Sequence, residues 1–343
     1  MTKWSIAHRR AHMVAEHALA DAGLAGHTRV DILSLLAAAG LHWHAGPGQR
    51  LFGSYLPGDS TRPGGIWINA NMPAVVQRHT AGHELGHHAL EHGLTCDTDA
   101  DVLAAQSGPM NLTEATAEAF AAWVLMPRRA LARARAVLGN PGEVPTPTQV
   151  YLIALQLGTS YRGTARHLGV ARLIPAAAAT ALGKTVLGRI KDRFEDPTAP
   201  PRTTHAEVWP LHKLTAASEL TFNHGDRIVL PAAADTAAET LIVAGVADIL
   251  HHSDTAITLT ARALPEDALG TPGDGRLPRW HDLPLPAAEH TLRVRVEPPL
   301  LRPPPVKLLD VSAMSSEELD RELARRAAAS VRAESDTVVR ELP

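Results

Sequence analysis

The sequence is poor in cysteine, in aromatic residues, in long apolar runs and in net charge. Its single cysteine, Cys96, cannot form an internal disulfide, which is typical of a reducing compartment. Only four Phe, six Trp and three Tyr are present, so Ala, Leu and Val must fill the core. No run reaches the roughly 18 apolar residues of a membrane span, and no signal-peptide core precedes residue 10, so we expect a soluble cytoplasmic protein. The formal charge of −3 gives no overall attraction to nucleic acid, so any DNA contact would require a local basic patch.

Helical spacing of apolar residues dominates the first half of the chain, and breaker residues separate the elements. We expect helices over residues 6–22, 30–39, 113–137 (interrupted near Pro127), 148–157, 161–168 and 182–194, and short strands over 41–44, 51–56 and 66–69. A further helix is expected from Asn71, as its N-cap, through Leu90, with Pro73 in the first turn and Gly93 just past its end. After the proline-rich stretch 195–201, β-branched residues predict strands over 226–230, 239–246, 256–263 and 291–296.

Five of the 19 histidines fall within 14 residues, in and just after the helix expected from Asn71. His83-Glu84-Leu85-Gly86-His87 is the pattern H-E-x-x-H. Residues four apart share one helix face, so both imidazoles can bind one metal ion with Glu84 beside it. Zinc with three protein ligands keeps a position for water and lowers the pKa of that water towards 7, and a nearby carboxylate can pass the proton to a leaving amine. By itself the motif is also compatible with structural histidines.

Two glycines lie in the same helix, four residues apart. Gly82 and Gly86 each weaken the helix by about 1 kcal/mol relative to Ala. Their spacing predicts a stripe on which another backbone approaches closely. A helix tolerates this loss more readily where a site depends on it.

A third metal ligand must come from outside the motif. The metzincin pattern H-E-x-x-H-x-x-G-x-x-H fails, because position 90 is Leu and position 93 is Gly, which leaves His92 out of register. Glu114 lies 27 residues after His87, and Glu118, one turn later, can accept a hydrogen bond from the far nitrogen of a ligand imidazole. Rival ligands are Asp97, Asp99 and Asp101. Glu114 and Glu118 are equally compatible with a solvated helix face.

Three stretches of the chain together resemble the ImmA/IrrE metallopeptidases. These are the H-E-L-G-H at 83–87, the E-x-x-A-x-x-F-A-A at 114–122 and the L-M-P at 125–127. The resemblance extends from about residue 5 to 170, through the strand around Gly53, the I-W-I-N at 66–69 and a helix-turn-helix-like segment at 152–168. Two positions depart from the family pattern: His79 stands where the family often has Phe, and Glu118 where it usually has Asn or Asp.

The resemblance implies that His83, His87 and Glu114 bind Zn²⁺ and that Glu84 is the catalytic base. The spacing of Glu118 adds the expectation that it supports a ligand imidazole from the outer shell. It further implies a zinc-dependent endopeptidase that cleaves one peptide bond in a protein, a helix-turn-helix repressor, and so induces stress-response or mobile-element genes.

The expected fold class is α+β, in four parts. Residues 1–140 form a mainly helical, zincin-like metallopeptidase domain with a small sheet, and residues 141–195 form a helical, helix-turn-helix-like segment. Residues 202–300 form a mostly β domain with a regulatory or partner-binding role. Residues 301–343 form a proline-rich spacer and a charged helical tail.

Two other functions compete with the enzyme. The first is a non-catalytic antirepressor or interaction protein with a structural zinc, against which Glu84 argues, because a structural metal has no need of a base. The second is direct nucleic-acid binding by the helix pair in 152–168. Arg162, Arg166 and His167 supply few charges for that purpose, so a structural or substrate-docking role is favoured and nucleic-acid binding is not expected.

We assign no function to two remaining features of the sequence. Cys96 follows the motif helix closely, but we expect an ordinary unpaired thiol there rather than a redox switch acting on the metal. The pair His251-His252 lacks a cysteine or a third histidine nearby, so a polar loop is expected rather than a metal site.

Overall fold

The structure is a computed structural model that describes residues 3–48, 51–59, 63–93, 95–98, 112–139, 142–263, 279–285 and 291–300, with side chains omitted at 3–5 and 95–98. The rival ligands Asp99 and Asp101, the proline-rich spacer and the helical tail lie outside the described residues, as do the side chains of Cys96 and Asp97. Contacts group residues 1–302 into one compact unit. The finer division of that unit at 140, 195 and 202 stays a prediction.

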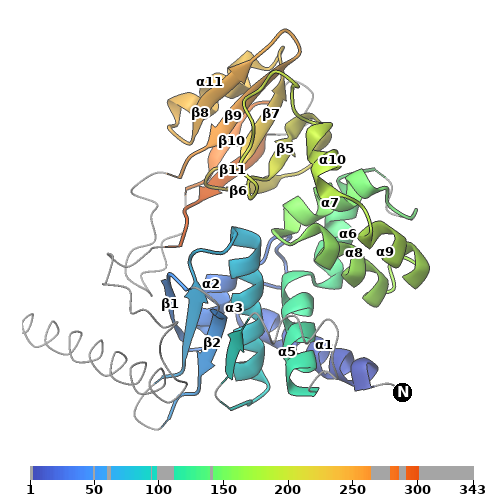
Figure 1. The fold of residues 1–343 in the computed structure, drawn as a ribbon, viewed down its shortest axis with the longest axis vertical. Coiled ribbons are helices and arrows are strands. Elements are labelled where there is room, and N and C mark those ends of the chain that lie inside the picture. The colour runs from blue at the N-terminus through green and yellow to red at the C-terminus, as the bar shows by residue number, and fades with distance from the viewer. Residues whose placement is uncertain are drawn as a thin grey trace, which may run out of the picture. The chain divides into compact units, whose positions relative to one another are not determined.

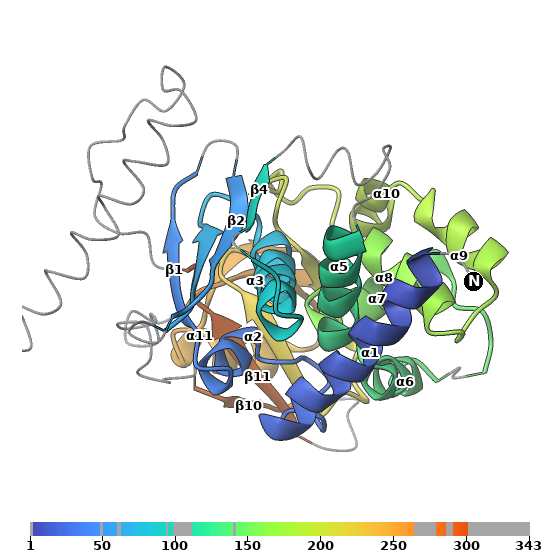
Figure 2. The ribbon, with the colours of Figure 1, turned by 90° about the horizontal axis from the view of Figure 1, so that it is seen from below.

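Helices and a small mixed sheet form the first part of the chain. The elements are α1 (Lys3–Asp21), α2 (Ile32–Ala38), β1 (His42–Gly46), β2 (Leu51–Leu56), β3 (Gly65–Asn69), α3 (Ala74–Ala89), β4 (Thr95–Thr98) and α5 (Leu112–Leu125). The sheet order is β1-β3-β2-β4, with β1 and β3 parallel and the other pairs antiparallel. Helix α3 packs against β2 and β3 on one side and α5 on the other, and α1 packs on α5 (Figures 1 and 2).

Five short helices follow, and two of them, α7 and α8, begin with side-chain caps. They are α6 (Arg128–Ala136), α7 (Pro147–Leu157), α8 (Tyr161–Val170), α9 (Ala176–Gly183) and α10 (Leu187–Asp192). Pro127 separates α5 from α6, as the sequence predicts. Thr146 and Gln149 form a capping box at the start of α7, Gly158 ends it with a left-handed φ of 66°, and Ser160 caps α8.

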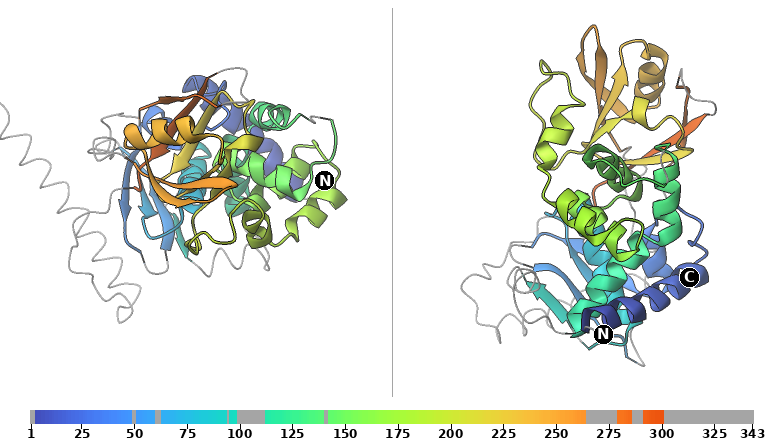
Figure 3. Two further views of the ribbon diagram at one scale, coloured as in Figure 1. Left: turned by 90° about the horizontal axis from the view of Figure 1, so that it is seen from above. Right: turned by 90° about the vertical axis from the view of Figure 1, so that its right-hand side faces the viewer.

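The last described part is mostly β. It comprises β5 (Val208–Pro210), a 3₁₀ turn (Leu211–Lys213), β6 (Glu219–Asn223), β7 (Arg227–Pro231), α11 (Asp235–Val243), β8 (Ala247–His252), β9 (Ala256–Ala261), β10 (His281–Leu283) and β11 (Leu292–Glu297). Among the described residues these strands form two mixed sheets, ordered β5-β7-β9-β8 and β10-β11-β6. Helix α11 contacts β8, β9 and β10, and so touches both sheets (Figure 3). The fold class is therefore mixed helix and sheet, in agreement with α+β.

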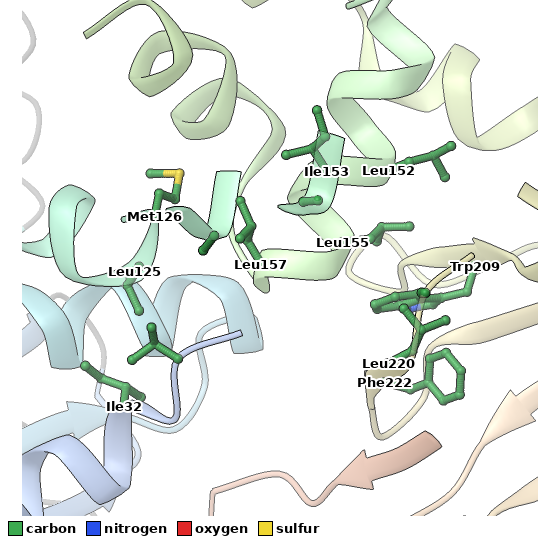
Figure 4. Packing of buried hydrophobic residues seen from close by; sticks show 14 of the residues in the cluster. Ile32, Leu125, Met126, Leu152, Ile153, Leu155, Leu157, Trp209, Leu220 and Phe222 are labelled. Atoms are coloured by element: carbon green, nitrogen blue, oxygen red, sulfur yellow. The ribbon is translucent and has the colours of Figure 1, made fainter. Parts of the chain in front are cut away.

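One apolar cluster runs through all three parts of the compact unit. Figure 4 shows Leu125 of α5 and Leu157 of α7 in it, together with Trp209 and Phe222 of the strands. Trp209 and Phe222 meet edge to face, with ring centroids 4.9 Å apart. Buried aliphatic and alanine side chains make up most of the rest, as the scarcity of aromatic residues predicts. No helix of the described part is long and apolar enough to span a bilayer.

Three predictions about secondary structure are wrong. A strand was expected over 239–246, but residues 235–243 form α11. The helix is stabilised because Ala237, Ala238 and Leu241 bury one of its faces. The β-branched residues beside them favour a strand, which led to the wrong prediction, although Ala has the strongest preference for a helix. Residues 182–194 are not one helix, since α9 ends at Gly183 and α10 starts after Val186. His251 and His252 lie in β8 rather than in a loop.

The caps of α3 also differ from expectation. The N-cap is Pro73 rather than Asn71, because Asn71 belongs to the preceding turn, where its N–H donates to the Asn69 carboxamide. At the other end the residue with left-handed backbone is Glu91, with φ of 58°, and not Gly93. The turn at Glu91 bears on the metal centre described below.

Glycines bring α3 and α5 into close contact, as their spacing predicts. A Cβ added at Gly86 would lie 3.1 Å from both Cα and the carbonyl oxygen of Ala117, and 3.2 Å from Cβ of Phe120. A Cβ added at Gly82 would meet Ala121 at an ordinary 3.4 Å. The contact is therefore tightest at Gly86, inside the H-E-x-x-H motif.

Gly86→Ala is expected to lower the free energy of unfolding by about 1–3 kcal/mol, because the added methyl group meets backbone that cannot move aside alone. Gly82→Ala is the matched control. It should be neutral or stabilising by up to about 1 kcal/mol, since Ala is the better helix former and the space at Gly82 admits it. Urea unfolding of both variants tests this. Equal stability of the two variants would contradict the close contact at Gly86.

Candidate metal centre

Helix α3 presents the three motif residues from one buried stretch. His83 is 8% exposed, and Glu84 and His87 are both 0% exposed. The apolar contacts of α3 with the sheet and with α5 fix its rotation, so the two imidazoles face the N-terminal end of α5. The ring centroids of His83 and His87 lie 4.7 Å apart.

Glu114, in the first turn of α5, meets both imidazoles. Its Oε2 lies 3.2 Å from Nε2 of His83 and 3.5 Å from Nε2 of His87, and the two Nε2 atoms are 2.9 Å apart. Among the described residues, these three form a group suited to a metal ion, with ligand atoms all within 4.8 Å of one another. Hydrogen bonds from His83 and His87 hold the pKa of the Glu114 carboxyl well below its usual range. The structure thus joins the motif to one of the proposed third ligands.

The carboxylate of Glu84 lies against strand β2. A Cβ added at Gly53 would come within 2.8 Å of Oε1 of Glu84 and 2.3 Å of Cγ2 of Thr80. Gly53 is therefore required because a larger residue would collide with Thr80 and Glu84, and not because its φ is unusual. Strand β2 therefore forms a wall against the Glu84 carboxylate, on the helix that carries His83 and His87.

Glu118 lies one turn after Glu114, but its nearest partners differ from the prediction. Its Oε2 is 2.7 Å from Nε2 of His79 and 3.8 Å from Nδ1 of His83, and its Oε1 accepts a hydrogen bond of 2.9 Å from Arg166. Burial opposes ionisation of Glu118, yet His79 and His83 together keep the pKa of its carboxyl well below the usual value. The two positions that depart from the ImmA/IrrE pattern, His79 and Glu118, therefore contact each other.

His92 lies beside His87 at the metal centre, a contact that the sequence did not predict. The left-handed turn at Glu91 reverses the chain after α3, and the His92 N–H donates to the carbonyl of His87 at 2.9 Å. Nδ1 of His92 then lies 3.0 Å from Nδ1 of His87, the nitrogen directed away from Glu114. Burial, with smaller contributions from His87 and Arg10, lowers the pKa of His92 to about 4. Spacing rules fail here because the contact depends on the turn.

Comparison with known proteins gives a match to a family model. A search of curated proteins finds no match to this chain. The Peptidase M78 family model, described as the IrrE N-terminal-like domain, matches residues 49–160. That range includes Gly53, the motif, Glu114 and Glu118, and it ends one residue before α8. Residues 49–160 thus match the IrrE N-terminal-like domain of the M78 peptidase family.

Proposed function

We propose that the protein is a zinc-dependent endopeptidase in which His83, His87 and Glu114 bind the metal and Glu84 is the catalytic base. The M78 domain supports a metallopeptidase. The observation that carries the proposal is the convergence of two imidazole nitrogens from α3 and one carboxylate oxygen from α5 within 4.8 Å.

The donor set suits zinc better than the hard cations. Two imidazoles and one carboxylate are a common catalytic zinc set, whereas Mg²⁺ and Ca²⁺ favour oxygen ligands. Both imidazoles are nearly buried, while the Glu114 side chain is 31% exposed, so the approach to the cluster is on the Glu114 side. When bound, zinc would polarise a peptide carbonyl and make a water molecule more acidic.

The protein residues then supply proton transfer and alignment. Glu84 takes a proton from the attacking water and returns it to the departing amine nitrogen. Gly53 leaves the space in which the Glu84 carboxylate is confined. Glu118, held by His79 and Arg166, lies behind His83, and His92 lies behind His87. Such outer contacts fix the orientation of ligand imidazoles.

The proposed substrate is a protein, specifically a helix-turn-helix transcriptional repressor, whose cleavage induces stress-response or mobile-element genes in the cytoplasm. The resemblance to the ImmA/IrrE metallopeptidases supports this choice. The competing function, a non-catalytic antirepressor with a structural zinc, is less well supported. A structural site gains nothing from a buried carboxylate at position 84, where burial of a polar group is costly.

Glu84→Gln should retain zinc and reduce cleavage by about 10²-fold or more, because the amide cannot accept the proton. His87→Ala should lose both zinc and cleavage. The measurements are metal content by mass spectrometry and the appearance of two discrete fragments from the purified repressor encoded beside this gene. A Glu84→Gln protein that still cuts the repressor at the wild-type rate would exclude Glu84 as the base.

Gly53→Ala should retain zinc but lose at least about tenfold in activity, because its methyl group displaces the Glu84 carboxylate. The double variant Gly53→Ala/Thr80→Ser removes the Thr80 methyl and with it the closer of the two clashes. It should therefore regain thermal stability but not activity. Full recovery of activity in the double variant would show that Gly53 serves Thr80 packing alone.

His92→Leu should weaken zinc binding by about 10–100-fold, since Nδ1–H of His87 loses its acceptor. His92→Asn is the matched control, because its side-chain oxygen can take the place of the imidazole nitrogen. Competition with a chromophoric chelator measures the affinity, and circular dichroism verifies folding. Equal zinc affinities for the Leu and Asn variants would exclude the hydrogen bond as the cause.

A further inference from the structure

Positive charge is concentrated in one segment of this mildly acidic chain. Residues 128–193 contain eleven Lys and Arg but two Asp and Glu, a net charge of 11 − 2 = +9. The rest of the chain has 22 basic and 34 acidic residues, a net charge of −12. The overall value of −3 therefore conceals a strongly basic region, which comprises helices α6 to α10.

Most of these cations lie on the surface. The exposed ones are Arg128, Arg129, Arg162, Arg166, Arg172, Lys184, Arg189 and Arg193. The two acidic residues of the segment, Glu143 and Asp192, are exposed as well, and Asp192 pairs with Arg202 at 2.8 Å. The described surface of the segment thus keeps a large excess of positive charge.

Helix α8 connects this surface to the metal centre. It contacts α5 through His167, whose ring meets Trp123 edge to face with centroids 4.5 Å apart. Nε2 of His167 also lies 3.1 Å from the carbonyl of Met126, which follows α5, and Figure 2 shows the two helices near each other. Arg162 and Arg166 are four residues apart, so they share the exposed face of α8. Arg166 donates to Glu118 at 2.9 Å, and Glu118 lies 3.8 Å from Nδ1 of His83.

We propose that the exposed face of α8, centred on Arg162 and held to Glu118 by Arg166, is a docking surface for an acidic segment of the protein substrate. The proposal rests on the endopeptidase function above and adds a substrate class to it. Arginine presents a planar set of donors that matches carboxylates, and complementary charge at a rim speeds encounter and sets register. The surface begins at the metal centre, so an acidic segment bound there places neighbouring peptide bonds close to Glu84.

A nucleic-acid partner fits the same charge less well. A recognition helix has to enter a major groove about 12 Å wide with its exposed face unobstructed. The Arg166 end of the α8 face is instead tied to Glu118 of α5. The contact that connects α8 to the metal centre therefore restricts its access to a DNA groove.

Binding can be measured without any cleavage. The full-length Glu84→Gln protein is titrated against a fluorescein-labelled deca-glutamate peptide at low salt, with anisotropy as the readout. Arg162→Glu in this background should weaken binding about tenfold, and added salt should weaken it further. The control is Arg262→Glu, which changes net charge equally at a half-exposed arginine after β9, and it should stay within about twofold of the parent.

Three results would overturn the proposal: no binding of the peptide, equal effects of the Arg162 and Arg262 variants, or tighter binding of a 20-base-pair duplex with the same dependence on Arg162. A second experiment compares reporter peptides with acidic and neutral flanks. For Arg162→Glu in the otherwise wild-type chain, the loss should appear as a higher KM for the acidic reporter. Failure of the wild-type protein to cleave any reporter would count against the endopeptidase function. The docking surface would then be judged by the anisotropy titration alone.

Discussion

The metal centre depends on the close approach of two helices. Glu114 reaches His83 and His87 because α3 and α5 pack closely, and Gly86 against the backbone of Ala117 is the tightest point of that contact. The glycine weakens helix α3 locally, which the packing offsets. Once the helices are fixed, the wall of β2 at Gly53 and the turn at Glu91 place the remaining groups around the same two imidazoles.

A buried polar network ties the motif helix to the rest of the compact unit. Arg78 of α3 donates to the carbonyls of Val30 at 2.8 Å and Gly158 at 3.1 Å. Arg29, beside Val30, pairs with Glu297 at the end of β11 and also donates to Asn223 of β6. Removal of one partner from a buried ion pair typically costs about 3–5 kcal/mol. The mostly β part therefore helps to hold α3 in place.

The sequence predicts the parts of this site that follow from local spacing. The period of apolar residues locates α3 and α5, Pro127 marks the end of α5, and the interval of four residues puts His83 and His87 on one face. The choice of Glu114 over the aspartates needed the family resemblance, because spacing does not fix the distance between helices.

The contacts of His79 with Glu118 and of His92 with His87 depend on helix packing and on one left-handed turn. Strand predictions fail at α11, where buried alanines outweigh β-branched neighbours. The net charge of the whole chain likewise conceals the basic segment at 128–193.

The central claim is that two imidazoles and one carboxylate hold a single zinc ion beside Glu84. X-ray absorption spectroscopy of the zinc-loaded, full-length protein tests it most directly. The account predicts a first shell of nitrogen and oxygen at about 2.0–2.1 Å, with imidazole scattering from two histidines and no sulfur. A sulfur scatterer near 2.3 Å would instead place Cys96 on the metal and contradict the assignment.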